Sequence, residues 1–442
     1  MERRDFIKAM SAGAAGLAGV LVQNVRPAAA GCADAPGQGI MPPPPGVVID
    51  ASPDSASIYL GSPSMEILPD GSYVASHEWF GDGARNLDGQ TDVFRSVDRG
   101  ATWERISEIP NARAHMMFWA GGALWMIGWI YPEGGIARQS IVIRRSDDGG
   151  RTWTVPKDGG SGLLLADSET NYFCDPAPVL VHGGRIWKEV EIEREREPGR
   201  INWSRCIEPI LMSAPVDSDL LDRASWTFTN SVKWLRRLGE VKVQGPRQDW
   251  NCCWEDSVDW EKLGGWVEGN ALFDPAGKMM VLMRVDDMPS CGKAARLEVS
   301  DDFKTLSFDP HKGLFSMPGG CKKFVIKYDP VSGKYWSLVS WVHPDDADAP
   351  DKERTRNTLA LVASEDLVSW EVRTIVYRHP DRQRGFQYVD WRIVGDDIHF
   401  VCRLAWYGSP NCHDANFLTF DRLENFRTLT RADDAPAFVP PR

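Results

Sequence analysis

Short apolar runs bounded by Gly, Asp, Pro or Asn recur along most of the chain. Clear examples are 123–130 (ALWMIGWI), 279–284 (MMVLMR) and 398–403 (IHFVCR). Each run has about the length of a β-strand, is apolar throughout or alternates with a period of two, and ends at turn-forming residues. The pattern predicts an all-β protein.

A polar phrase of the form S-x-D-x-G-x-T-W stands between such runs twice, at 96–103 and 146–153. We interpret it as a β-hairpin turn in which the Asp and the Ser or Thr hold the loop backbone, the Gly takes a positive φ, and the Trp packs against the next strand. The segments 300–308 and 364–370 keep the Ser, the acid and the closing aromatic residue but lack the Gly, and 213–226 is a looser copy.

This phrase resembles the Asp-box of the sialidase-like β-propellers, where it is a folding element and not a site. Propeller blades take about 40–50 residues, so a mature chain of roughly four hundred residues has room for six to eight. We predict a seven-bladed β-propeller, with six blades as the alternative. Residues 48–442 are expected to form this single domain, because no composition break follows a Pro-rich spacer at 31–47.

Residues 1–30 have the pattern of an export signal. RRDFIK at 3–8 resembles the twin-arginine motif, an apolar stretch follows at 9–22, and AAA at 28–30 suits a signal peptidase. We therefore expect a periplasmic or secreted protein that is exported in its folded state. The rest of the chain has no run of eighteen apolar residues, so no membrane span is predicted. The sequence leaves open whether Cys32 carries a lipid.

The formal net charge is −12 at pH 7, which disfavours nucleic acids and anionic membranes as partners. A local pocket of Arg and Lys can still bind an anionic sugar. The nine cysteines lack the paired C-x-x-C spacing of a zinc site. We expect no metal and no cofactor, apart from a structural cation that the central channel could hold. The expected partner is an oligo- or polysaccharide, and the expected state is a monomer.

Six polar segments stand beside predicted turns, and the loops at one end of a propeller converge on its axis. Each segment also has a structural interpretation, such as a His bonded to a neighbouring loop or an acid that holds loop amides. A metal site at 412–414 is disfavoured, because successive strand residues point to opposite faces. The candidates are His77, Glu268, Lys322, Asn357, Tyr388, Asp390, Arg392 and His413.

Several phrases together resemble a known group of proteins. They include GSPSMEILPDGSYVASHEWFG, GWVEGNALF, MPGGCKKFVIKYDP, GFQYVDWRI and CHDANFLTFDRLENFR. The group is the sialidase superfamily of seven-bladed propellers with its α-L-rhamnosidases and rhamnose–glucuronate lyases, and more distantly the ulvan lyases. The resemblance covers about 55–430. It implies that His77 is the catalytic His near the N-terminus, and that Tyr388, Arg392 and His413 contact the substrate.

The chain also departs from these relatives. Cys321 and Asp421 stand where the relatives commonly have His. True sialidases use an arginine triad with a Tyr–Glu nucleophile pair and open with an Arg-Ile-Pro phrase, which is absent here, so sialic acid is not the expected substrate. Ulvan lyases use two closely spaced histidines, whereas the next His after His77 is His115.

We predict an exported enzyme that cleaves a glycosidic bond beside a uronic or otherwise acidic sugar, such as a rhamnose–glucuronate linkage. Hydrolysis often uses two carboxylates, for which Glu268 and Asp390 are the only candidates. β-Elimination would use His77 as base or acid, Tyr388 as a proton relay, and Arg392 with Lys322 to hold the carboxylate. The alternatives are a non-catalytic lectin-like propeller and a sialidase-type exo-glycosidase.

Overall fold

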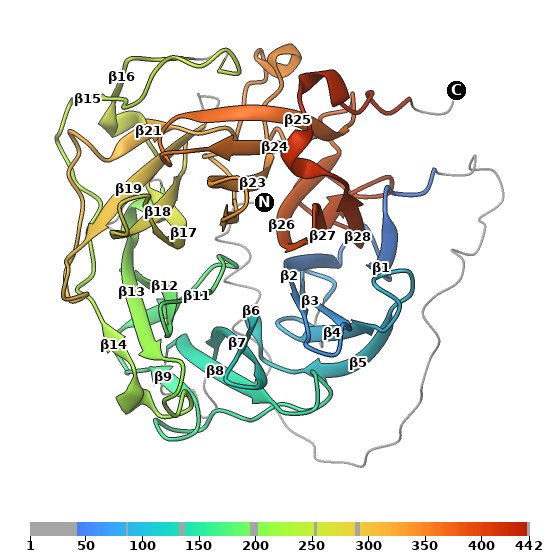
Figure 1. Ribbon diagram of the computed structural model, residues 1–442, viewed down its shortest axis with the longest axis vertical. Coiled ribbons are helices and arrows are strands. Elements are labelled where there is room, and N and C mark those ends of the chain that lie inside the picture. Colours follow the sequence, from blue (N-terminus) through green and yellow to red (C-terminus); the bar gives the residue numbers. More distant parts are fainter. Residues whose placement is uncertain are drawn as a thin grey trace.

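The computed structural model describes residues 42–84, 87–131, 138–194, 202–251, 254–287 and 292–439. In this part of the chain the backbone forms six large antiparallel sheets arranged around one axis (Figure 1). The protein is therefore an all-β propeller, as predicted, with six blades, which is the alternative count. The export signal expected at 1–30 lies outside the described residues.

The first three blades follow one another along the chain, each with its innermost strand first. Blade 1 is β2 (Tyr59–Ile67), β3 (Tyr73–Phe80), β4 (Thr91–Ser96) and β5 (Glu104–Ile109). Blade 2 is β6 (Arg113–Ala120), β7 (Ala123–Ile130), β8 (Ser140–Ser146) and β9 (Leu163–Leu165). Blade 3 is β10 (Asn171–Phe173), β11 (Leu180–His182), β12 (Arg185–Glu193), β13 (Ile207–Pro215) and β14 (Thr227–Phe228), in which β10 and β11 both pair with β12.

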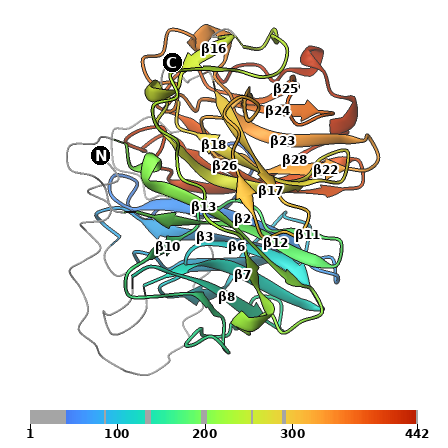
Figure 2. The same cartoon turned by 90° about the vertical axis from the view of Figure 1, so that its left-hand side faces the viewer.

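The last three blades complete the ring. Blade 4 is β17 (Trp266–Phe273), β18 (Met279–Val285), β19 (Lys293–Val299), β20 (Leu306–Ser307) and β21 (Leu314–Ser316). Blade 5 is β22 (Ile326–Asp329), β23 (Lys334–Ser340), β24 (Thr358–Ser364) and β25 (Trp370–Arg378). Blade 6 is β26 (Gly385–Val394), β27 (Asp397–Ala405), β28 (Phe417–Leu423) and the N-terminal strand β1 (Val47–Ala51). Blades 2 and 5 lie on opposite sides of the axis (Figure 2).

Strand β1 closes the ring, because it pairs antiparallel with β28 and so becomes the outermost strand of blade 6. The described helices are all short 3-10 turns, and no described helix is long and apolar enough to cross a membrane. They are η2 (Trp203–Cys206), η3 (Arg223–Ser225), η4 (Trp260–Lys262), η5 (Pro344–Asp346), η6 (Phe426–Thr428) and η7 (Arg431–Asp433).

The prediction of seven blades was wrong. It rested on the chain length and a usual blade length, and so it assumed that every residue of the domain belongs to a blade. The described residues of 229–265, between blades 3 and 4, form no radial sheet of their own. They carry η4 and the hairpin of β15 (Glu240–Lys242) and β16 (Ser257–Asp259), and they run along the outside of the ring (Figure 1). Gln244 bridges to Phe315 of blade 4, and the Trp250 indole donates to the Trp370 carbonyl of blade 5 at 2.7 Å.

Both complete Asp-boxes form the turns that the sequence predicts. In the first, Thr102 Oγ1 donates to Asp98 Oδ2 at 2.6 Å, the Gly100 amide donates to Ser96 Oγ at 2.7 Å, and the Trp103 indole donates to the Gly100 carbonyl. The second box repeats these three hydrogen bonds at 146–153. Both turns follow the third strand of a blade, so they belong to the scaffold.

We expect Gly100→Ala to lower the free energy of unfolding by about 2–5 kcal/mol, because a left-handed non-glycine residue costs about 1–2 and overpacking about 1–3 kcal/mol. Gly100 has a φ of +90°, and a Cβ there would lie 2.2 Å from the Phe420 ring. The matched control is Gly122→Ala, where φ is +81° and nothing lies within 4 Å. Equal losses for the two variants in urea unfolding would contradict this role of the Phe420 contact.

Candidate functional site

Four innermost strands carry the same irregularity near their first residues. β2, β6, β17 and β26 each contain a β-bulge at which the pairing register shifts. Because the innermost strands of successive blades run in one direction, these bulges lie at one end of the central axis, which we call the mouth. One residue in each bulge has a left-handed backbone: Ser62 (φ 46°), Ala114 (φ 50°), Glu268 (φ 61°) and Tyr388 (φ 55°). Such strained residues tend to gather at functional sites.

Two of these bulge residues meet across the mouth. The Tyr388 hydroxyl donates to Glu268 Oε1 at 2.8 Å, although the residues come from blades 6 and 4. The backbone amide of Glu268 donates to Glu191 Oε1 at 2.8 Å. The next amide, of Gly269, donates to Glu189 Oε2 at 3.0 Å. A Cβ at Gly269 would lie 2.7 Å from Glu189 Cγ, so only glycine permits this close approach.

Arg284, near the end of β18, fixes the second oxygen of Glu268. Its Nη1 lies 2.7 Å from Glu268 Oε2, and its Nε donates to the Cys321 carbonyl. Burial opposes ionisation of Glu268, but Arg284 and the hydrogen bond from Tyr388 outweigh it and lower the pKa of Glu268. Burial and the Glu268 charge raise the pKa of Tyr388 to about 12. At neutral pH the pair is therefore a carboxylate that accepts a hydrogen bond from a neutral phenol.

A loop of blade 5 adds an acid and a second arginine. Glu353 Oε1 accepts from Arg284 Nη2 at 2.8 Å and from Arg356 Nη2 at 2.9 Å. Burial opposes ionisation of Glu353, but Arg356 and Arg284 outweigh it and lower the pKa of Glu353 to about 2. Arg356 also donates to Gln387, beside Tyr388. Both arginines are thus already neutralised by carboxylates of the protein.

A third arginine near Tyr388 forms no ion pair with a carboxylate among the described residues, although the charges of Asp414 and Glu78 act on it. The guanidinium of Arg403, on β27, lies 4.4 Å from the Tyr388 ring centroid and 5.3 Å from that of Phe80. Its Nη2 donates to the His413 carbonyl at 2.8 Å, whereas its Nε is buried without a hydrogen-bond partner. It forms no ion pair with any described residue, and burial lowers its pKa. A buried cation of this kind favours an incoming anion.

His413 stands beside Arg403 at the mouth. Its Nδ1 lies 2.8 Å from Asp414 Oδ1, and its side chain is 29% exposed. Burial lowers the pKa of His413 to about 3, so the imidazole is neutral at neutral pH. No described residue hydrogen-bonds its Nε2. The geometry leaves that nitrogen as an available proton acceptor.

Four of the predicted site residues thus belong to one group: Glu268, Tyr388, His413 and Lys322. Lys322 is buried, its Nζ lies 3.6 Å from Cys321 Sγ, and it forms no ion pair with the described residues. Burial lowers the pKa of Lys322, and Arg356 and Glu353 are among the charges that act on it. It therefore lies beneath the mouth and not on its surface.

His77 is not brought to this group. Successive residues of a strand face opposite sides. On β3 it is Glu78 that faces blade 2, and its carboxylate accepts from Ser62 Oγ of blade 1 and from the Ala114 amide of blade 2. His77 faces blade 6 instead, and its Nε2 lies 2.8 Å from Asp50 Oδ2 on β1. The side chain of His77 is 0% exposed. These contacts assign His77 to the closure of the ring, and the expected convergence with Tyr388 is not seen.

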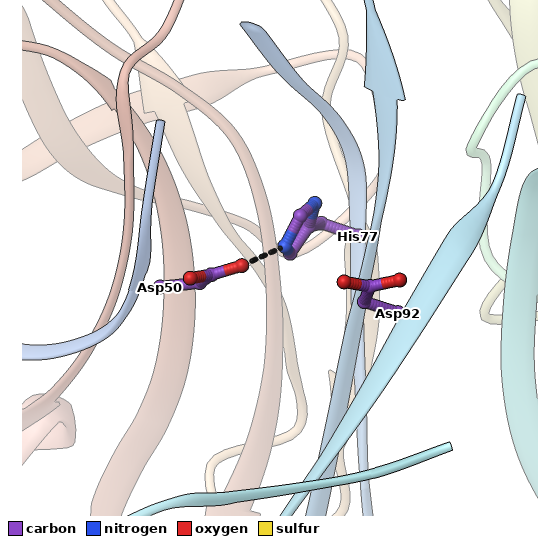
Figure 3. A group of neighbouring side chains, drawn as sticks. All are labelled: Asp50, His77 and Asp92. Atoms are coloured by element: carbon purple, nitrogen blue, oxygen red, sulfur yellow. Dashed lines mark hydrogen bonds and ion pairs between the residues drawn. The ribbon is translucent and has the colours of Figure 1, made fainter. Parts of the chain in front are cut away.

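Asp50, His77 and Asp92 are the one group of described residues with the spacing of metal ligands (Figure 3). The donor set does not fit a cation, because the Asp92 carboxylate already accepts from the Trp79 indole and from Gln90, and pairs with Arg105 at 3.1 Å. The Arg105 charge already compensates that of Asp92. The cluster is better described as a buried ion-pair network between blades 1 and 6.

Arg392 and Asp390 lie farther along β26, in the central channel. Arg392 sits four residues from Tyr388, about 13 Å at the usual strand rise. Its guanidinium makes two contacts of 3.1 Å with Glu66 of blade 1 and one of 3.0 Å with Asp390. Asp390 also accepts from the Met65 amide. Since its partners are already inside the protein, Arg392 joins blades 6 and 1 and is not the expected holder of a substrate carboxylate.

Asn357 is likewise directed away from the mouth, because its amide donates to Asp346 and to the His379 carbonyl within blade 5. The preceding residue, Arg356, lies at the mouth, where Asn357 was expected. Sequence reasoning also passed over Arg284 and Arg403. A usable signal was present, because each arginine directly follows apolar residues near the end of a buried strand, where a buried cation must meet an anion or a ligand.

Comparison with known proteins supports the fold. No family model matches the sequence, and no curated protein matches it. An α-L-arabinanase of Penicillium chrysogenum has a similar structure, with 15% identity over 87% of this chain and 98% of that one and a TM-score of 0.51. An α-L-arabinofuranosidase of Fusarium graminearum gives 12% identity over 86% and 98%, with a TM-score of 0.51. A Hadza microbial sialidase gives 14% identity over 86% and 68%, with a TM-score of 0.52.

Loss of the His77–Asp50 pair is expected to destabilise the fold in a pH-dependent way. Burial opposes the protonation of His77, but Asp50 and Asp92 outweigh it and raise its pKa above 6.5. The stabilisation is therefore fully present below pH 6.5 and is lost as pH rises through the raised pKa. The difference in Tm between the unchanged protein and Asp50→Asn should shrink from acidic to alkaline pH. A difference that grows with pH would contradict this role.

Proposed function

We propose that this protein is a glycoside hydrolase in which Tyr388 is the nucleophile and Glu268 is its base. The observation that carries the proposal is the 2.8 Å hydrogen bond from the Tyr388 hydroxyl to a carboxylate whose other oxygen is fixed by Arg284. A nucleophile next to a base that is itself oriented by a third group is the usual arrangement for covalent catalysis. Tyrosine serves as nucleophile in sialidases, which are exceptions among glycosidases.

The chemistry would proceed in two displacements. In the first, the phenol oxygen bonds to the anomeric carbon, its proton passes to Glu268, and the glycosidic C–O bond breaks as the leaving oxygen takes a proton from solvent. In the second, water attacks the same carbon and releases a proton to solvent, the bond from that carbon to the phenol oxygen breaks, Glu268 returns its proton to that oxygen, and the sugar is released. Because Tyr388 is neutral until it reacts, it can approach a sugar that carries a negative charge without repulsion.

We further propose that the substrate contains a uronic or otherwise acidic sugar, as the sequence suggested. Arg403 supports this specificity, since it is buried against Tyr388 without a carboxylate partner among the described residues. A guanidinium binds a carboxylate through parallel hydrogen bonds. Arg403 replaces Arg392 in this role. The export signal expected at 1–30 supports activity on polysaccharide outside the cytoplasm.

β-Elimination is the second candidate, and it is favoured by His413 Nε2, which no described residue hydrogen-bonds. An imidazole beside Arg403 could remove the proton at C5 of a uronate while Arg403 neutralises the carboxylate and Tyr388 protonates the leaving oxygen. The product would carry a C4–C5 double bond. The two mechanisms make different use of Glu268 and His413, so variants and products can distinguish them.

Hydrolysis predicts that Tyr388→Phe and Glu268→Gln each lower kcat/KM by at least about a hundredfold, the usual scale for a lost acid or base. The assay is release of reducing sugar from a panel of plant and algal acidic polysaccharides. His77→Gln is a suitable control, because His77 lies between blades and should change stability more than turnover.

An unsaturated product that absorbs near the ultraviolet edge, with activity lost in His413→Ala and retained in Glu268→Gln, would replace hydrolysis by elimination. Glycan binding without any product, unchanged in Tyr388→Phe, would support a lectin-like propeller instead.

The acid limb of kcat/KM should lie below pH 4.5, because activity needs the carboxylate form of Glu268 and its pKa is lowered from 4.5. The ionised form prevails above the pKa, so activity falls only as pH drops through it. Removing the positive charge in Arg284→Gln should move this limb to higher pH. A limb near pH 7 would instead point to Glu189, whose pKa burial raises to about 7.

A further inference from the structure

Arg284 and Arg356 share a carboxylate that comes from a loop and not from a blade. Glu353 lies between η5 and β24, and its Oε1 accepts from both guanidinium groups. Its side chain is 19% exposed, so the carboxylate reaches the mouth. The loop is held by Asp346, which accepts from Asn357 at 3.1 Å and pairs with Arg382 at 2.7 Å. The arrangement is a carboxylate-binding site filled by the chain itself.

The three arginines meet Tyr388 in different places. Arg284 approaches its hydroxyl end through Glu268. Arg403 lies over the ring at 4.4 Å from the centroid, and Arg356 lies at 5.7 Å. A carboxylate on the reacting carbon of a sugar would sit at the hydroxyl end, beside Arg284 and the Glu353 carboxylate that Arg284 shares with Arg356. A carboxylate farther out on the sugar would sit nearer to Arg403.

We propose that Glu353 determines specificity: it excludes sugars with a carboxylate on the anomeric carbon and leaves only Arg403 to bind an acidic group. This inference rests on the proposed function, because it takes Tyr388 as the group that attacks the anomeric carbon. A second carboxylate beside Glu353 would meet a like charge, and arginines that are already paired gain little by exchanging one carboxylate for another. Uronic acids, whose carboxylate is remote from the anomeric carbon, avoid this conflict.

The test is a binding measurement with a matched pair of ligands, the 2,3-dehydro derivative of sialic acid and its methyl ester. Both are resistant to hydrolysis, and they differ only in the charge at the position that Glu353 is proposed to guard. In Glu353→Gln the acid should bind at least about tenfold more tightly than in the unchanged protein, on the scale of one charged hydrogen bond. The ester should bind equally to both proteins.

Asp351→Asn is the matched control. It removes one negative charge from the same loop, but the Asp351 carboxylate accepts from the Arg354 amide and pairs with neither arginine of the site. Its affinity for the acid should match that of the unchanged protein. If Glu353→Gln fails to fold, Glu353→Ala must give the same preference for the acid.

Unchanged affinity for the acid in a folded Glu353 variant would overturn the proposal, as would an equal gain for the ester. Turnover plays no part in this measurement. Absence of hydrolysis would therefore count against the proposed function, whereas absence of the charge-dependent gain would count against the role of Glu353.

Discussion

A backbone forced into the left-handed region at the start of the innermost strands is the constraint on which the candidate site depends. The bulges at Glu268 and Tyr388 turn two side chains toward one another across the mouth, where regular strands would keep their alternation. The conformation is costly for a residue with a Cβ. It persists because carboxylates of blade 3 hold the bulge amides of blade 4 and because Gly269 leaves space for them.

The buried arginines around these bulges differ in how many carboxylates they pair with. Arg284 pairs with three carboxylates and Arg356 with one, so their burial is compensated within the protein. Arg403 is buried as deeply but stacks on two aromatic rings and bonds only a carbonyl. At the mouth, Arg284 and Arg356 are therefore neutralised by carboxylates of the protein, whereas Arg403, over the Tyr388 ring, is not. The proposed preference for an acidic sugar follows from this difference between the arginines around Tyr388.

The scaffold solves a separate problem, which is to close a ring whose last blade is built from both ends of the chain. β1 completes blade 6, and the His77–Asp50 pair ties that strand to blade 1. Arg392 makes the same connection near the axis through Glu66. Polar residues that look like active-site chemistry in the sequence are thus used to hold blades together, while the neighbouring residues Glu78 and Arg356 reach the mouth.

The sequence by itself determined the all-β propeller, the Asp-box turns and the segments that carry the site, because strand periodicity and turn chemistry are local. Glu268, Tyr388 and His413, which it named as candidates, lie together at the mouth, since each stands in a polar segment beside a turn. Only the tertiary structure decided the number of blades, because the segment between blades 3 and 4 adds to the chain length, but its described residues form only the two-stranded sheet of β15 and β16 and no radial blade. Only the tertiary structure chose Glu78 over His77 and Arg356 over Asn357, because a shift of one residue along an extended chain moves a side chain to the opposite face, and a bulge resets that alternation.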